Sequence, residues 1–80
     1  LLFGETPTLT LEKARHANTS GYRAAKFGWG PFGKDSGEDR DQLMAAREGL
    51  GPDALLLVDV GCIWRGPNAV EDATRRREML

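Results

Sequence analysis

The sequence has few of the features that small or membrane-bound proteins often depend on. Cys62 is the only cysteine among 80 residues, so no intrachain disulfide and no cysteine-based metal cluster can compensate for a small core. No run approaches the roughly 18 apolar residues that span a membrane, and no signal-peptide pattern opens the chain. We therefore expect a cytoplasmic protein that is stabilised by packing and has no membrane partner.

An excess of charge of one sign is also missing. Eleven Lys and Arg are balanced by twelve Asp and Glu, which gives a formal net charge of −1. Proteins that bind a nucleic-acid backbone usually present a strongly basic face, so we expect no nucleic-acid partner. A chain this short buries only about 60% of its unfolded surface, and it opens at Leu1 without Met. These features suggest a piece of a longer protein.

Short apolar runs alternate with longer amphipathic stretches, and Gly and Pro separate them. The pattern predicts strands at 1–3, 22–27 and 54–59 and helices at about 7–19, 35–48 and 67–80. Strands that are joined through a helix are almost always parallel. The expected fold is therefore a βαβαβα segment of a parallel α/β sheet, either doubly wound or barrel-like. The continuous apolar run at 54–59 is typical of a strand that is buried on both faces.

Two charged residues fall where such folds place their chemistry, at the carboxyl ends of strands. Lys26 and Asp59 end neighbouring predicted strands, so they are expected to face one pocket. An Asp on a rigid strand end is a suitable Mg²⁺ ligand. The alternative is a carboxylate that only caps a loop or pairs with Lys26.

Other residues are weaker candidates. Trp29 and Trp64 lie in loops at the same end, where aromatic rings either line a ligand pocket or cover the core. Cys62 is expected to be a buried thiol, and His16 a surface or packing residue. The Arg75–Arg77 cluster is expected to be a solvated helix end.

A glycine-rich segment partly matches a phosphate-binding P-loop. Residues 28–34 fit its first seven positions. However, Asp35 stands where Ser or Thr would bind Mg²⁺, and Pro31 removes one backbone N–H. Nucleotide binding is therefore only a third alternative.

Several stretches carry a family resemblance, namely GYRAAKFGWG at 21–30, DQLMAARE at 41–48, GPD at 51–53 and LLLVDVGCIW at 55–64. They resemble the early barrel of the mandelate racemase and muconate lactonizing enzyme family, within the enolase superfamily. The resemblance implies a TIM-type (β/α) barrel, of which residues 1–80 would form about three βα units without the capping domain. Enzymes of this family remove a proton α to a carboxylate and stabilise the enolate on Mg²⁺.

The resemblance also implies residue roles. Asp59 matches the first of three metal-binding carboxylates, and Lys26 matches the first Lys of a Lys-x-Lys pattern that helps to neutralise the substrate carboxylate. Gly28 replaces the second Lys, which is usually a base, and Gly61 replaces an Asn that often follows the metal ligand. The base is therefore expected outside this chain, as in acid-sugar dehydratases that draw it from a His–Asp pair on later strands.

The leading hypothesis is a fragment of a Mg²⁺-dependent acid-sugar dehydratase or racemase that acts on a small carboxylate or sugar acid. One carboxylate cannot hold Mg²⁺ firmly, so the isolated chain is expected to be inactive. The alternative is a non-catalytic, self-associating βα unit, because three parallel strands leave open edges and an apolar face. Either a second copy or the remainder of the barrel would cover them.

Overall fold

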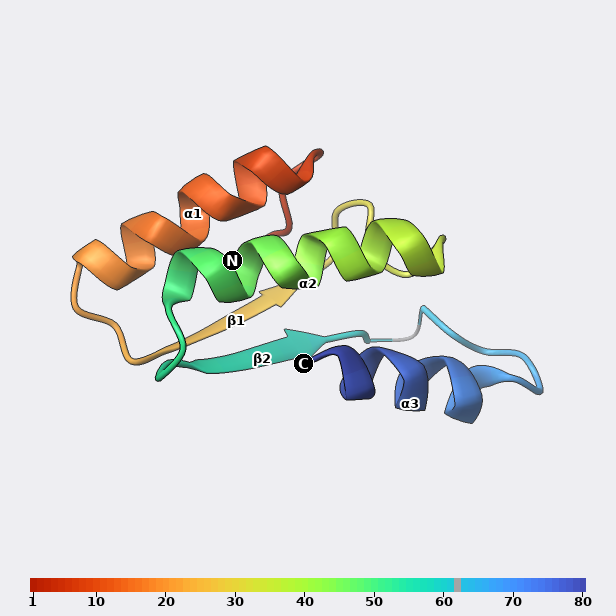
Figure 1. Ribbon diagram of the computed structural model, residues 1–80. Coiled ribbons are helices and arrows are strands. Elements are labelled where there is room, and N and C mark those ends of the chain that lie inside the picture. The colour runs from red at the N-terminus through yellow and green to blue at the C-terminus, as the bar shows by residue number, and fades with distance from the viewer. Residues whose placement is uncertain (62) are drawn as a thin grey trace.

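The computed structural model describes residues 1–61 and 63–80, so the expected burial of Cys62 lies outside the described residues. The elements along the chain are α1 (Pro7–Thr19), β1 (Ala24–Gly28), α2 (Ser36–Leu50), β2 (Leu55–Asp59) and α3 (Ala69–Met79) (Figure 1). β1 and β2 pair in parallel, in a register that sets Ala24 opposite Leu55 and Gly28 opposite Asp59. The parallel α/β class predicted from the sequence is confirmed.

The two earlier predicted strands differ from the structure at their ends. The run at 1–3 forms only a parallel bridge between Leu2 and Gly28, although Phe3 N–H donates to Gly28 O at 3.0 Å. Residues 1–3 therefore lie beside β1, in the position that a third parallel strand of the sheet would occupy. β1 begins at Ala24 rather than Tyr22, because Tyr22 N–H donates to Ala17 O at the end of α1 instead of to the sheet.

The helices follow their capping signals. α1 has the predicted bounds, with Thr6 Oγ1 accepting from Leu9 N–H at 3.3 Å and Pro7 in the first turn. α2 begins after Asp35, whose carboxylate accepts from Glu38 N–H, and runs two residues beyond the predicted end. α3 begins at Ala69, two residues later than predicted.

Small residues allow α1 and α2 to lie close together. A Cβ on Gly49 would stand 2.5 Å from the Ala14 Cβ and 2.7 Å from Leu11 O. α1 has few large apolar side chains, but it still packs into the core, because its small residues Ala14 and Ala17 are both buried there.

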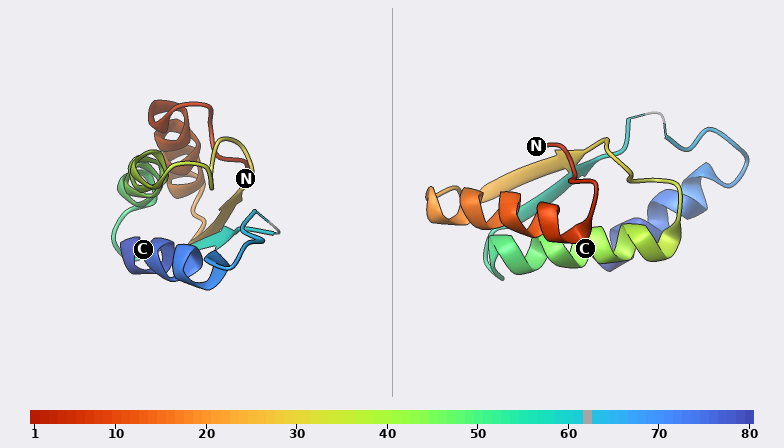
Figure 2. Two further views of the ribbon diagram at one scale, coloured as in Figure 1. Left: turned by 90° about the vertical axis from the view of Figure 1, so that its right-hand side faces the viewer. Right: turned by 90° about the horizontal axis from the view of Figure 1, so that it is seen from above.

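All three helices lie on one side of the strands (Figure 2). Phe27 and Leu56 point to this side and are buried. The alternate side chains of β2 point away, and Leu55 and Leu57 are 65% and 49% exposed. The prediction that this strand is buried on both faces is wrong for the described residues, because their helices cover one face only.

Candidate functional site

Lys26 and Asp59 meet on the face of the sheet that the described helices leave uncovered, which we call the open face. They lie at the carboxyl ends of the strands. Lys26 Nζ lies 3.8 Å from Asp59 Oδ2, and the two side chains are 63% and 49% exposed. Lys26 stands opposite Leu57 and Asp59 opposite Gly28, so the two charges approach each other diagonally across neighbouring strands. The structure thus brings together the two residues that the sequence singled out.

The chain after β2 orients the Asp59 carboxylate. Gly61 N–H donates to Asp59 Oδ1 at 2.9 Å. This local hydrogen bond leaves Oδ2 on the side of Lys26. The carboxylate therefore has one oxygen fixed by the backbone and one oxygen directed to the open face.

Gly28 marks a close approach between the strands. A Cβ at this position would lie 2.9 Å from Asp59 O and 3.4 Å from Asp59 Cβ. A side chain there would require the end of β2 to shift. The close contact gives a structural reason why a glycine stands where the family pattern has its second Lys.

Trp29 lies beside this pair. It borders a depression of about 260 Å³ that Lys26, Gly28 and Asp59 also line. Trp29 has a φ of 55°, a conformation that costs energy for a bulky residue, and its side chain is largely exposed. A residue with an unfavourable backbone conformation thus places an aromatic ring at the edge of the candidate site.

Trp64 lies elsewhere, on the helix-covered side. Its Nε1–H donates to Gly33 O at 3.1 Å, and its ring lies 6.3 Å from the Phe32 ring and 4.9 Å below the Arg76 guanidinium. The cavity that it borders is lined by residues of α2, β2 and α3 rather than by Lys26 or Asp59. The structure therefore does not bring Trp64 to the strand-end pair.

The last helix corrects the prediction that the Arg75–Arg77 cluster is solvated. Arg76 is buried rather than solvated, because its Nε donates to Asp39 Oδ2 at 2.9 Å. Val70, in the first turn of the same helix, is 78% exposed. No local pattern indicates the Asp39–Arg76 pair, since Asp39 lies in an acidic cluster that also suits the start of a helix.

The P-loop-like segment uses its amide groups within the protein. Gly33 N–H donates to Asp39 Oδ1, and Phe32 N–H donates to Trp29 O. The Asp35 carboxylate occupies the start of α2, where it accepts from Glu38 N–H. These contacts argue against phosphate binding, because two of the donors that would hold the anion already have acceptors within the protein.

The metal-ligand set is incomplete in this segment. Among residues 1–61 and 63–80, no three His, Cys, Asp or Glu side chains gather closely enough to hold a metal ion. Asp59 is a hard oxygen ligand on a rigid strand end, which fits Mg²⁺ as one ligand of several. Further ligands would have to come from other parts of a larger protein.

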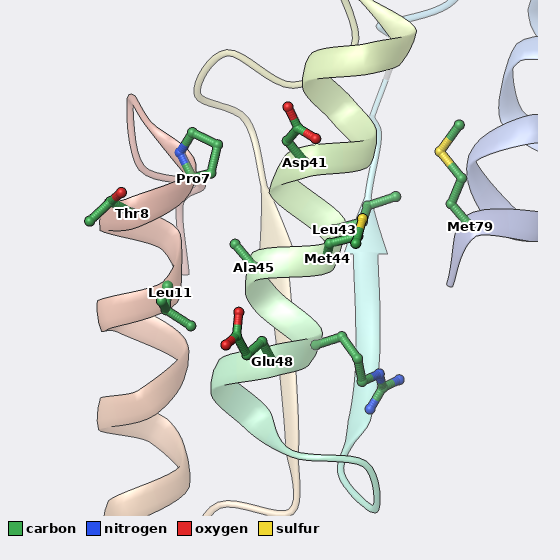
Figure 3. Close-up of a pocket in the computed structure, with 10 residues that line it drawn as sticks. Pro7, Thr8, Leu11, Asp41, Leu43, Met44, Ala45, Glu48 and Met79 are labelled. Carbon is green, nitrogen blue, oxygen red and sulfur yellow. The ribbon is translucent and has the colours of Figure 1, made fainter.

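A larger groove, of about 600 Å³, lies between the helices (Figure 3). Its lining includes Leu11 of α1, Met44 of α2 and Met79 of α3, with the carboxylates of Asp41 and Glu48 nearby. None of the predicted site residues lines it. Its size does not make it the better candidate, because parallel α/β folds place their chemistry at the carboxyl ends of the strands, where Lys26 and Asp59 lie.

Two further sequence expectations concern the surface. His16 is exposed on α1, in line with its expected role as a surface residue. The helices described in the structure include none with the length and apolar character needed to cross a membrane.

Comparisons with known proteins agree with this architecture. Residues 10–79 match the family described as enolase C-terminal domain-like. The crystal structure of a predicted mandelate racemase from Rhodobacter sphaeroides is similar over 99% of this chain, with 55% sequence identity and a TM-score of 0.87. A comparison with curated proteins found no match. The chain covers 20% of the Rhodobacter protein. The family match over most of its length and the high identity establish that this chain belongs to the enolase superfamily, as a mandelate racemase-like segment of the enolase C-terminal domain-like family.

Proposed function

We propose that this chain is the early part of a (β/α) barrel in a Mg²⁺-dependent enzyme that removes a proton α to a carboxylate. The observation that carries the proposal is the placement of Lys26 and Asp59, 3.8 Å apart on one open face at the carboxyl ends of parallel strands. That edge is where barrel enzymes assemble their active sites. The similarity to a predicted mandelate racemase supports an isomerase or lyase.

Asp59 is proposed to hold the metal ion. Gly61 N–H fixes one carboxylate oxygen, and the other faces the open side of the sheet. When bound, Mg²⁺ would act as a Lewis acid toward the enolate that forms on proton removal. Asp59 then serves as one anionic ligand of a set that later strands complete.

Lys26 is proposed to bind the substrate carboxylate. Its ammonium is exposed and lies next to the proposed metal ligand, so a carboxylate group on the open face would meet a positive charge there. Trp29 would form an apolar wall on the same side. The close approach at Gly28 leaves β1 without a second lysine, and the base is therefore proposed to come from a later strand.

The substrate class and reaction follow from these roles. A small carboxylate or sugar acid has an α-proton that can be removed and a carboxylate that Lys26 and a metal ion would bind. Proton removal followed by loss of water would make the enzyme an acid-sugar dehydratase, and proton return to the opposite face would make it a racemase. Both outcomes share the residues proposed here.

The test uses a full-length protein that carries this segment, with the 80-residue chain alone as a comparison. Exchange of the substrate α-proton in deuterated water is followed by NMR over a panel of sugar acids and 2-hydroxy acids, with and without Mg²⁺. Asp59→Asn and Lys26→Met are expected to lower exchange by about a hundredfold or more, since each removes a charge at the reacting group.

Two variants serve as matched controls. Lys34→Met and Asp53→Asn remove exposed charges of the same kinds away from Lys26 and Asp59, and both should retain exchange. The 80-residue chain alone should show none. Mg²⁺-dependent exchange by that chain would contradict the proposal that later strands complete the site, and full activity of Asp59→Asn would contradict the proposed role of Asp59.

A second candidate function is self-association without catalysis. The exposed Leu55 and Leu57 on the open face favour it, because isolated soluble units rarely leave a contiguous apolar face uncovered. The proposed barrel covers this face with later strands, whereas the second candidate covers it with another copy. Light scattering of the 80-residue chain separates them: a monomer at high concentration would argue against self-association.

A further inference from the structure

Two buried polar side chains lie one turn apart on α2. Asp39 has no exposed surface and Gln42 is 3% exposed. In the described residues, no buried side-chain nitrogen or oxygen lacks a hydrogen-bond partner. Buried polar groups cost free energy unless they are satisfied, so the partners of these two residues indicate what they hold in place.

Gln42 holds the turn after the first strand segment. Gly4 N–H donates to Thr10 Oγ1, and Gly4 O accepts from Gln42 Nε2, both at 2.9 Å. The Thr10 hydroxyl in turn donates to Gln42 Oε1. A Cβ on Gly4 would lie 2.5 Å from Leu9 Cβ. We call this arrangement of Gly4, Thr10 and Gln42 the first glycine anchor.

Asp39 holds the loop after β1 in the same manner. Gly33 N–H donates to Asp39 Oδ1 at 2.9 Å, and Gly33 O accepts from Trp64 Nε1 at 3.1 Å. Arg76 donates to the other Asp39 oxygen and lies over the Trp64 ring. Gly33, Asp39, Trp64 and Arg76 form the second glycine anchor.

The two anchored loops contact each other, and the loop after β1 carries Trp29. A Cβ on Gly30 would lie 2.6 Å from Phe3 O, so the residue after Trp29 packs directly on the end of the first strand segment. Trp29 stands between these contacts with a φ of 55°. A strained backbone persists only where its surroundings fix it, and each loop on either side is fixed through a polar residue of α2.

We infer that Asp39 and Gln42, through the two glycine anchors, are positioning residues that hold Trp29 at the strand-end site. Any effect of this positioning on a substrate rests on the proposed function, since Trp29 borders the depression beside Lys26 and Asp59. The anchors themselves are a property of the loops. They act from the helix-covered side of the sheet and touch neither charged group.

The experiment measures the loops without metal or substrate, so its result does not depend on the proposed function. Amide hydrogen exchange and the indole N–H resonance of Trp29 are recorded by NMR on the full chain. Thr10→Val removes the acceptor of Gly4 N–H with little change in shape. We expect Gly4 exchange to accelerate about tenfold or more and the Trp29 resonance to move. Thr10→Ser keeps the hydroxyl and should restore both.

The second anchor is tested with Asp39→Ala, and Asp41→Ala is the matched control because Asp41 is exposed on the same helix. Only Asp39→Ala should accelerate hydrogen exchange at the Gly33 amide and move the Trp29 resonance, whereas Asp41→Ala should change neither. If Asp39→Ala does not fold, the Thr10 pair still decides the outcome. An unmoved Trp29 resonance despite faster glycine exchange would overturn the inference, as would equal shifts in Thr10→Val and Thr10→Ser.

Discussion

The two faces of the sheet differ in what surrounds them. On the helix-covered face, Phe27 and Leu56 are buried, and the nearby Asp39–Arg76 pair lies at 2.9 Å with almost no exposure. On the open face, Leu57 is half exposed and Lys26 and Asp59 stand 3.8 Å apart in solvent. Alternate residues of the same short strands thus lie in an apolar interior or in water.

The helix-covered face is packed by residues of this chain, whereas the open face is not covered by any described residue. The covered face has a packed core and satisfied buried polar groups within the described residues. The open face carries the candidate chemistry, but its apolar side chains have no described neighbours that bury them. The segment therefore builds the support of a site, and the proposed later strands would supply its remaining walls.

The largest effect is expected from adjacent leucines on opposite faces. Leu56→Ala should lower the free energy of unfolding by about 2–5 kcal/mol, because it leaves a cavity in the core. Leu57→Ala should change it by less than about 1 kcal/mol, since that side chain is already half in water. Urea unfolding of the 80-residue chain measures both.

The protein concentration is the control for this pair. If Leu57→Ala cost as much as Leu56→Ala, and the cost grew with concentration, a second copy would be covering the open face. That outcome would favour the self-associating alternative over the proposed barrel segment.

The sequence predicted the covered half of this structure well, because local signals specify it. Capping residues set the bounds of α1 and the start of α2, and apolar runs marked both strands. The burial of the second strand was overestimated, since a run of leucines has the same composition whether one face or both are covered. That distinction depends on neighbours outside the run.

The candidate site was only partly predictable. Lys26 and Asp59 could be paired because parallel strands bring their carboxyl ends together. Trp29 and Trp64 looked equivalent, as each lies in a loop after a strand, but only the hydrogen bond to Gly33 and the stacking with Arg76 place Trp64 on the helix side. The hydrogen bond joins residues 31 positions apart, the stacking joins residues of a loop and a helix, and no local pattern encodes either contact.

A smaller effect should appear at Trp29, where the anchored loops support a strained residue beside the open face. A φ of 55° penalises any side chain with a Cβ. We therefore expect Trp29→Gly to be more stable than Trp29→Ala by about 1 kcal/mol in urea unfolding. Both variants lose the ring that borders the site.

Glu12 provides the matched control, because it is an exposed residue inside α1. There the order should reverse, with Glu12→Ala more stable than Glu12→Gly by about 1 kcal/mol. If the alanine variant were the more stable one at both positions, the backbone at Trp29 would not be strained. The two glycine anchors would then not be needed to maintain its conformation.

The smallest effect should come from the ion pair on the open face. A double-mutant cycle with Lys26→Met and Asp59→Asn in the 80-residue chain should give a coupling of less than about 0.5 kcal/mol, because solvent screens two exposed side chains. That coupling should fall further at high salt. A coupling well above 1 kcal/mol that resists salt would mean that the pair is shielded from water, and the contrast between the two faces would not hold for the isolated chain. A weak coupling leaves both charges available, Asp59 to a metal ion and Lys26 to a carboxylate, which is what their proposed roles require.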